Sequence, residues 1–107
     1  MATVEVERTL VKSPPELWDE VGSEQALSRW LGDVRVSSKD PPHRLEWDSD
    51  VAQGVIELEA SGWGTKIRAH GKTSRAPAWE RLRKSYDLER ALKKLLDDLG
   101  SSSLTSG

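Results

Sequence analysis

VIELEASGWGTKIRA, residues 55–69, decides the fold, because it predicts two strands joined by a tight turn. Apolar and polar residues alternate on both sides of the Gly62-Trp63 pair, which is the pattern of half-buried strands. Gly62 suits the first central position of a type II′ turn, a kind that joins antiparallel strands. The segment therefore predicts a β-hairpin with Trp63 at its tip, where the ring either folds back over the end of the core or stands exposed for contact with another chain.

Charged residues predict the register of this hairpin. A turn centred on the Gly-Trp pair sets Glu59 against Lys66 and Glu57 against Arg68. On the opposite face the same register pairs apolar residues, namely Leu58 with Ile67 and Ile56 with Ala69. A slip of one residue would place both glutamates opposite apolar side chains, so side-chain matching favours this register.

A second hairpin is predicted around SSKDPPH, residues 37–43, with both prolines in its loop. Its expected register sets Val36 against Leu45, Arg35 against Glu46 and Val34 against Trp47. The two hairpins together predict strands at 33–38, 43–49, 53–61 and 64–73, with one apolar and one charged face. Such a sheet needs an apolar element laid across it.

A further strand is predicted at the N-terminus, from Thr3 to Val11. Alternation points Arg8 toward the apolar face, and a buried guanidinium requires an acceptor. A ligand carboxylate or enolate would serve, and so would a carboxylate of the chain itself. A strand bulge that turns Arg8 outward is the third reading.

Two short helices are expected after this strand. Ser13 and Glu16 in SPPE have the spacing of a capping box, with proline at the first helical position. The first helix then runs to Gly22. Ser23 caps the second, which carries Leu27, Trp30 and Leu31 and ends at Gly32.

The cover for the sheet is predicted in the C-terminal third, where residues 78–99 form a long amphipathic helix. Its apolar stripe is expected to contain Trp79, Leu82, Tyr86, Leu92, Leu96 and Leu99, broadened by Leu88, Ala91 and Leu95. Gly100 is expected to end the helix, and the small polar residues 101–107 to form a flexible tail.

Composition narrows the classes of function. The chain has 107 residues, enough for one domain with one core. Its 16 basic and 18 acidic residues are interspersed, which argues against nucleic acid as a partner. With no cysteine it has no disulfide and no thiolate nucleophile. No apolar run reaches membrane-span length and no signal peptide is seen, so a cytoplasmic protein is expected.

The order strand, two short helices, antiparallel meander, long helix resembles the START-like (SRPBCC) superfamily. The match is strongest over RTLVKSPPELWDEVGSEQALSRWLGD, residues 8–33, which is similar to the polyketide cyclase and heat-shock-chaperone ATPase activator branches. The Gly-Trp-Gly-Thr hairpin and ERALKKLLDDLG, residues 89–100, are also similar. The resemblance implies an α+β helix-grip fold, a curved antiparallel sheet around the last helix, with residues 1–100 as one START-like domain. About five strands are expected here, fewer than the family usually has.

The resemblance also implies a site for an apolar small molecule between the sheet and the C-terminal helix. Its walls would be Trp30, Trp47, Ile56, Leu58, Ile67, Leu82 and Tyr86, with Arg8 as polar anchor. The same apolar residues would serve equally as a filled core. Tyr86 could instead place its hydroxyl at the rim.

Three functions follow as hypotheses. The first is non-catalytic binding of a lipid, an aromatic or a polyketide-like molecule. The second is a protein-interaction module like the chaperone-ATPase activators, using the sheet edge or Trp63. The third is an aromatase or cyclase-type enzyme, for which no acid–base group can be named. No cofactor and no metal are expected, since His43 and His70 lack ligand spacing. An exposed sheet edge also predicts a homodimer.

Overall fold

Five strands form one antiparallel sheet in the order β1-β5-β4-β3-β2. The computed structural model describes residues 3–73 and 76–105. The strands are β1 (Thr3–Leu10), β2 (Arg35–Asp40), β3 (Arg44–Asp48), β4 (Gln53–Ser61) and β5 (Gly64–Lys72). The helices are α1 (Pro14–Val21), α2 (Glu24–Leu31), the 3-10 turn η1 (Ala78–Glu80) and α3 (Arg81–Thr105). The predicted α+β helix-grip fold is confirmed.

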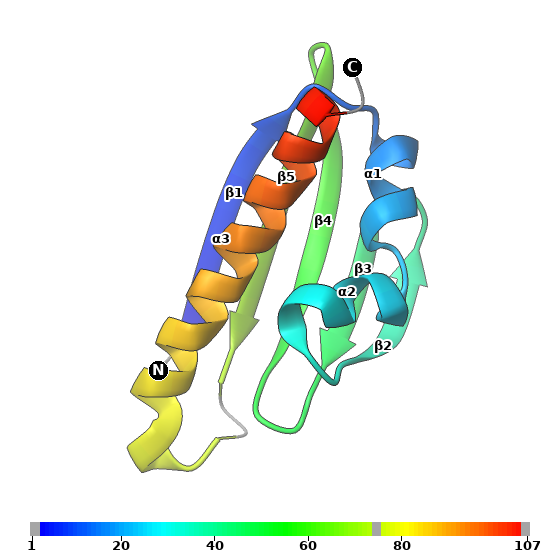
Figure 1. Cartoon of the computed structure of the whole chain (residues 1–107). Coiled ribbons are helices and arrows are strands. Elements are labelled where there is room, and N and C mark those ends of the chain that lie inside the picture. The colour runs from blue at the N-terminus through cyan, green and yellow to red at the C-terminus, as the bar shows by residue number, and fades with distance from the viewer. Residues whose placement is uncertain (1–2, 74–75, 106–107) are drawn as a thin grey trace.

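All three helices lie on one face of the curved sheet (Figure 1). The long helix α3 packs on β1 and β5, while α1 packs on β4 and α2 against α3. The core lies between these helices and the sheet. The N-terminal turns of α3 reach past the end of the sheet (Figure 1). None of the helices in the described part of the chain is long and apolar enough to cross a membrane.

The register of the β4–β5 hairpin is the one predicted from its charges. Glu59 lies opposite Lys66 and Glu57 opposite Arg68, and Ser61 pairs with Gly64 across the two-residue turn. Gly62 has a φ of 58°, a backbone conformation that residues other than glycine rarely adopt. The ring of Trp63 at the tip is 99% exposed, so it does not fold back over the core.

Arg68 of β5 forms its ion pair with Glu7 of β1, the neighbour of β5 on the side away from β4. Its guanidinium donates to the Glu7 carboxylate of β1 at 2.9 and 3.1 Å. This hydrogen bond, together with the charge of Glu7, raises the pKa of Arg68. Glu57 instead lies 3.9 Å from both Arg44 and His70. The outer face of the sheet is therefore a charged ladder that spans β1, β5, β4 and β3.

The register predicted for the β2–β3 hairpin is wrong. Val36 pairs with Trp47 rather than Leu45, and Arg35 with Asp48 rather than Glu46. The reason is that β2 continues to Asp40, which shortens the connection. A bulge between Val36 and Ser38 then absorbs one residue, so that Val36 and Trp47 keep their place on the inner face.

The two edges of the sheet are β1 and β2. The sheet has fewer strands than the family usually has, but β5 pairs directly with β1, so no strand between them is left unpaired. β2 is short, bulged and mostly exposed, which are features that discourage edge pairing. In β1, antiparallel self-pairing centred on Val6 would set Glu5 of one copy against Glu7 of the other. The homodimer through a sheet edge stays a prediction, and these charges oppose it.

The prediction that Gly100 ends the last helix is wrong, since α3 continues to Thr105. Gly100 does not have a positive φ, and a methyl group added there would lie 3.4 Å from a Leu10 side-chain carbon, an ordinary contact. Residues 106–107 of the expected tail lie outside the described residues.

On the inner face of the sheet, the indole ring of Trp47 lies over two neighbouring positions that have no side chain, Gly54 and Gly71. Trp47 of β3 pairs with Gly54 of β4, which in turn pairs with Gly71 of β5. A methyl group at Gly54 would lie 2.6 Å from Cζ2 of Trp47, and one at Gly71 would lie 3.0 Å from the same atom. The ring of Trp47 thus fills the space that the two glycines leave.

We predict that Gly71→Ala lowers the free energy of unfolding by about 1–3 kcal/mol, because the added methyl group overpacks this contact. In a Trp47→Leu background the same change should cost at least about 0.5 kcal/mol less, since the two positions are in contact. Urea unfolding of the four proteins of this double-mutant cycle measures both values. Additive effects would show that Trp47 does not rest on Gly71.

We also predict that Gly100→Ala raises the free energy of unfolding by about 0.5–1 kcal/mol, because alanine is favoured over glycine inside a helix. It adds the same methyl group as Gly71→Ala at a place with room for it. A loss of stability on urea unfolding would mean that the helix ends at Gly100 after all.

Candidate functional site

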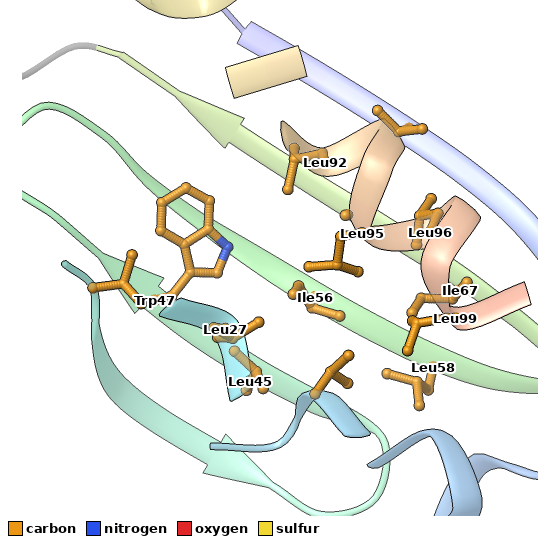
Figure 2. Close-up of a cluster of buried hydrophobic side chains, with 14 of the residues drawn as sticks. Leu27, Leu45, Trp47, Ile56, Leu58, Ile67, Leu92, Leu95, Leu96 and Leu99 are labelled. Carbon is orange, nitrogen blue, oxygen red and sulfur yellow. The ribbon is translucent and has the colours of Figure 1, made fainter. Parts of the chain in front are cut away.

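Four of the predicted ligand-binding residues are packed core. Trp47, Ile56, Leu58 and Ile67 are each at most 2% exposed. They face a row of leucines from α3, namely Leu92, Leu95, Leu96 and Leu99, with Leu27 and Leu45 beside them (Figure 2). The space between Ile56, Ile67 and α3 is therefore a filled core rather than a cavity for a ligand.

Two other predicted wall residues face solvent. Leu82 is 84% exposed and Tyr86 is 61% exposed, and Trp79 of the same predicted stripe is 81% exposed. Their placement against the sheet was therefore predicted wrongly.

The phase of the helix explains this error. The buried stripe of α3 contains Leu88, Leu92, Leu95 and Leu99, and its continuation toward the N-terminus falls on Ser85 and Arg81 rather than on the apolar residues. Polar contacts hold both residues, of which Ser85 is half-buried and Arg81 is exposed. The hydroxyl of Ser85 is 2.9 Å from that of Thr73, and Arg81 Nε donates to the carbonyl of Ala76 at 2.9 Å.

A pocket remains where α2, α3 and the β3–β4 connection meet beside Trp47. We call it the inner pocket. Its volume is about 180 Å³, and it is lined by Trp30, Leu31, Trp47, Ser49, Val51, Ala52, Thr73, Lys84, Asp87, Leu88 and Ala91. Most of these residues are apolar. Of the residues predicted to bind a ligand, it brings together Trp30 and Trp47.

Local hydrogen bonds hold the walls of the inner pocket. The hydroxyl of Ser49 accepts from the backbone N–H of Val51 and of Ala52, at 3.4 and 3.2 Å, which shapes the β3–β4 turn. Thr73, fully buried, donates to the carbonyl of Arg81 at 3.2 Å. These contacts place two apolar residues and one hydroxyl around the same space. The sequence did not identify Val51, Ala52 or Thr73 as site residues, because none of the three lies on a strand or a helix.

The indole N–H of Trp47 has no hydrogen-bond partner. Its Nε1 is the one buried side-chain nitrogen or oxygen in residues 3–73 and 76–100 that lacks one. In Figure 2 this nitrogen lies on the side of the ring toward Ile56 and Leu95, which offer no acceptor. Leaving a buried donor unpaired costs about 1–3 kcal/mol.

Trp30, by contrast, is anchored. Its Nε1 donates to the carboxylate of Asp98 on α3 at 2.7 Å. This bond ties α2 to α3 and orients the second indole wall of the inner pocket. The neighbouring Asp97 forms an ion pair with Arg8 of β1.

Arg8 therefore lies outside the inner pocket. Its side chain points to the inner face, as alternation predicted. Of the acceptors considered for it, the structure supports a carboxylate of the chain itself, that of Asp97. Its side chain remains 43% exposed at the edge of the sheet. These two contacts explain why acidic residues occupy adjacent positions near the end of α3. Asp97 contacts Arg8 of β1, and Asp98 contacts Trp30 of α2.

A larger pocket of about 530 Å³ lies on the outer face of the sheet. Its side chains are mostly polar or charged, including Glu46, Asp48, His70 and Lys72. Water solvates such a surface well, so an apolar molecule gains less there than on the walls of the inner pocket. Within the described part of the chain, no three histidine, aspartate or glutamate residues are grouped so as to hold a metal ion.

No family model matches the chain, and no curated protein matches it either. Solved structures do match. Ms6760 from Mycobacterium smegmatis superposes with a TM-score of 0.69 at 12% sequence identity, covering 99% of this chain and 93% of that protein. The Aha1 dimer from Colwellia psychrerythraea gives 0.65 at 13% identity, covering 94% and 97%.

DynU16, a protein in the dynemicin biosynthetic locus, gives a TM-score of 0.64 at 16% identity. The match covers 92% of this chain but 47% of DynU16, so the chain spans about half the length of that protein. At these identities the likeness shows a shared fold. It is the helix-grip arrangement described above.

We predict that Asp98→Ala lowers the free energy of unfolding more than Asp97→Ala does. Asp98 accepts a hydrogen bond from a half-buried indole, which is worth about 1.5–3 kcal/mol for a charged acceptor. Asp97 forms an exposed ion pair, worth at most about 1 kcal/mol. Urea unfolding of the two single variants compares them, and equal losses would contradict the anchoring role of Asp98.

Proposed function

We propose that the protein binds a small, mainly apolar molecule in the inner pocket without transforming it. The observation that carries this proposal is a pocket of about 180 Å³ with two indole walls, beneath the helix that grips the sheet. An apolar cavity of about 150 Å³ is known to hold benzene. The proposed ligand is therefore about one aromatic ring in size, smaller than the polyketide-like molecule first expected.

The unpaired N–H of Trp47 favours a ligand that carries one hydrogen-bond acceptor. The ring of Trp47 lines the inner pocket, while its nitrogen is covered by neighbouring side chains. Because this nitrogen lies on the side of the ring toward Ile56 and Leu95, the ring would have to turn on binding to present its N–H to a ligand oxygen and recover the cost of the missing bond. An aromatic ketone or aldehyde has the matching shape and polarity.

Binding is favoured over catalysis by what the inner pocket contains. Its ionisable lining residues are Lys84 and Asp87, both on α3, and its other polar groups are the hydroxyls of Ser49 and Thr73. Thr73 is already engaged with Arg81 and Ser85. A cyclase-type reaction needs an acid or base placed against the substrate, and no residue of this lining is set apart for that role. The START-like resemblance of residues 8–33 accords with a ligand-binding member of that superfamily.

We predict that acetophenone raises the melting temperature by roughly 5–10 °C at ten times its Kd, because binding to the native state alone contributes about 1.4 kcal/mol there. Ethylbenzene, which lacks the carbonyl oxygen, should bind at least about tenfold more weakly. In a proton–nitrogen correlation spectrum, the indole N–H signal of Trp47, assigned with Trp47→Phe, should move downfield with acetophenone and not with ethylbenzene.

Ala91→Leu supplies the control, since it adds a side chain to the wall of the inner pocket on a helical residue. The variant should keep its fold and lose the response to acetophenone. The signal of Trp63, which is exposed at the far hairpin, should stay in place throughout. Binding of both compounds to Ala91→Leu as to the wild type would place the ligand elsewhere and overturn the proposal.

A further inference from the structure

Three large apolar side chains project into solvent at the N-terminal end of α3. We call Trp79, Leu82 and Tyr86 the outer stripe; they are 81%, 84% and 61% exposed. Their spacing of three and four residues places them along one side of the helical segment formed by η1 and α3. Single exposed apolar residues are common on proteins, but a contiguous group marks an interaction surface.

Basic residues flank the outer stripe. Arg83 and Arg90 lie seven residues apart on the same side of α3, about 10 Å along its axis. The guanidinium of Arg90 lies 5.9 Å from the centre of the Tyr86 ring, a cation–π contact that holds it beside the stripe. Arg83 forms no ion pair with any residue that the structure describes. Tryptophan, tyrosine and arginine are the residues that dominate binding energy in protein interfaces.

We propose that the outer stripe docks an amphipathic helix of a partner protein, one whose apolar face is bordered by carboxylates seven residues apart. The apolar side chains would cover Leu82 and the two aromatic rings. The carboxylates would accept hydrogen bonds from Arg83 and Arg90, whose planar guanidinium groups suit that pairing. Charge complementarity thus selects the acidic partner.

Charge also disfavours the other occupants. From Trp79 to Arg90 the segment holds four basic residues, Arg81, Arg83, Lys84 and Arg90, and three acidic ones, Glu80, Asp87 and Glu89. Four basic residues only reach the lower limit of the clusters that bind an anionic membrane, and the three acidic residues among them reduce the net charge of the segment to about +1. A second copy of the chain, packed antiparallel, would bring Arg83 of one copy against Arg90 of the other.

The test measures fluorescence anisotropy of a labelled synthetic helical peptide with leucines on one face and two glutamates seven residues apart beside them. A matched peptide carries lysines in place of the glutamates. The full-length protein should bind the glutamate peptide at least about tenfold more tightly than the lysine peptide. The double variant Leu82→Ser/Tyr86→Ser should lose at least about tenfold in affinity for the glutamate peptide, with its circular dichroism unchanged.

Two matched variants sharpen the test. Trp63→Ser removes another exposed ring, far from the outer stripe, and should leave the affinity unchanged. Arg83→Glu/Arg90→Glu should reverse the preference, so that the lysine peptide binds more tightly. The reversal is a readout that a general loss of stability would not produce.

Equal binding of both peptides would overturn the proposal, and so would an equal loss of affinity in Trp63→Ser. Binding to phosphatidylglycerol vesicles that depends on Leu82 and Tyr86, without binding to the peptide, would assign the stripe to a membrane instead. Self-association in sedimentation that Leu82→Ser/Tyr86→Ser abolishes would assign it to a second copy. The response of Trp47 to acetophenone is measured at a different surface and does not depend on any of these outcomes.

Discussion

The packing of Trp47 against Gly54 and Gly71 is the contact on which the rest of the structure depends. A five-stranded sheet gripped by one helix has little interior to fill, and a single indole ring fills the part of it next to the two glycines. The leucines of α3 then meet Ile56 and Ile67 directly. A pocket remains to one side of the ring, where the β3–β4 turn, α2 and α3 converge to form the inner pocket. The size of the proposed ligand therefore follows from the residue that fills the core.

The long helix is divided between two tasks. Its C-terminal half is buried on one side and tied to β1 by Asp97 and to α2 by Asp98. Its N-terminal half extends past the sheet and is fixed on its inner side by polar contacts through Thr73 and Ser85 (Figure 1). Leu82 and Tyr86, in the first turns of this half, have no part of the sheet to cover, and they face outward. The inner pocket lies under the boundary between the two halves, so one helix contributes both to the proposed ligand site and to the proposed docking surface.

Much of the fold could be predicted from the sequence, because charges and capping residues report on local geometry. The pairs Glu57–Arg68 and Glu59–Lys66 specify the β4–β5 register, and Ser23 does cap α2, accepting from the N–H of Ala26 at 3.1 Å. The β2–β3 register could not be predicted, since a bulge leaves no mark in a pattern of alternation. The placement of Leu82 and Tyr86 was predicted wrongly because hydrophobicity alone does not reveal that Ser85 and Arg81 are held by contacts with Thr73 and Ala76. For the site, Trp30 and Trp47 could be identified as large rings near the concave face, but a pocket wall from a turn such as Val51-Ala52 depends on tertiary contacts.

The central claim is that Trp47 fills the core and leaves the inner pocket as the apolar space open to a ligand. A crystal structure under xenon pressure tests it most directly, because xenon enters apolar cavities without needing a specific partner. A xenon atom is expected in the inner pocket, between the ring of Trp47 and the side chains of Leu88 and Ala91, and none between Ile56, Ile67 and α3. Xenon bound behind Ile56 and Ile67, with the inner pocket empty, would contradict it.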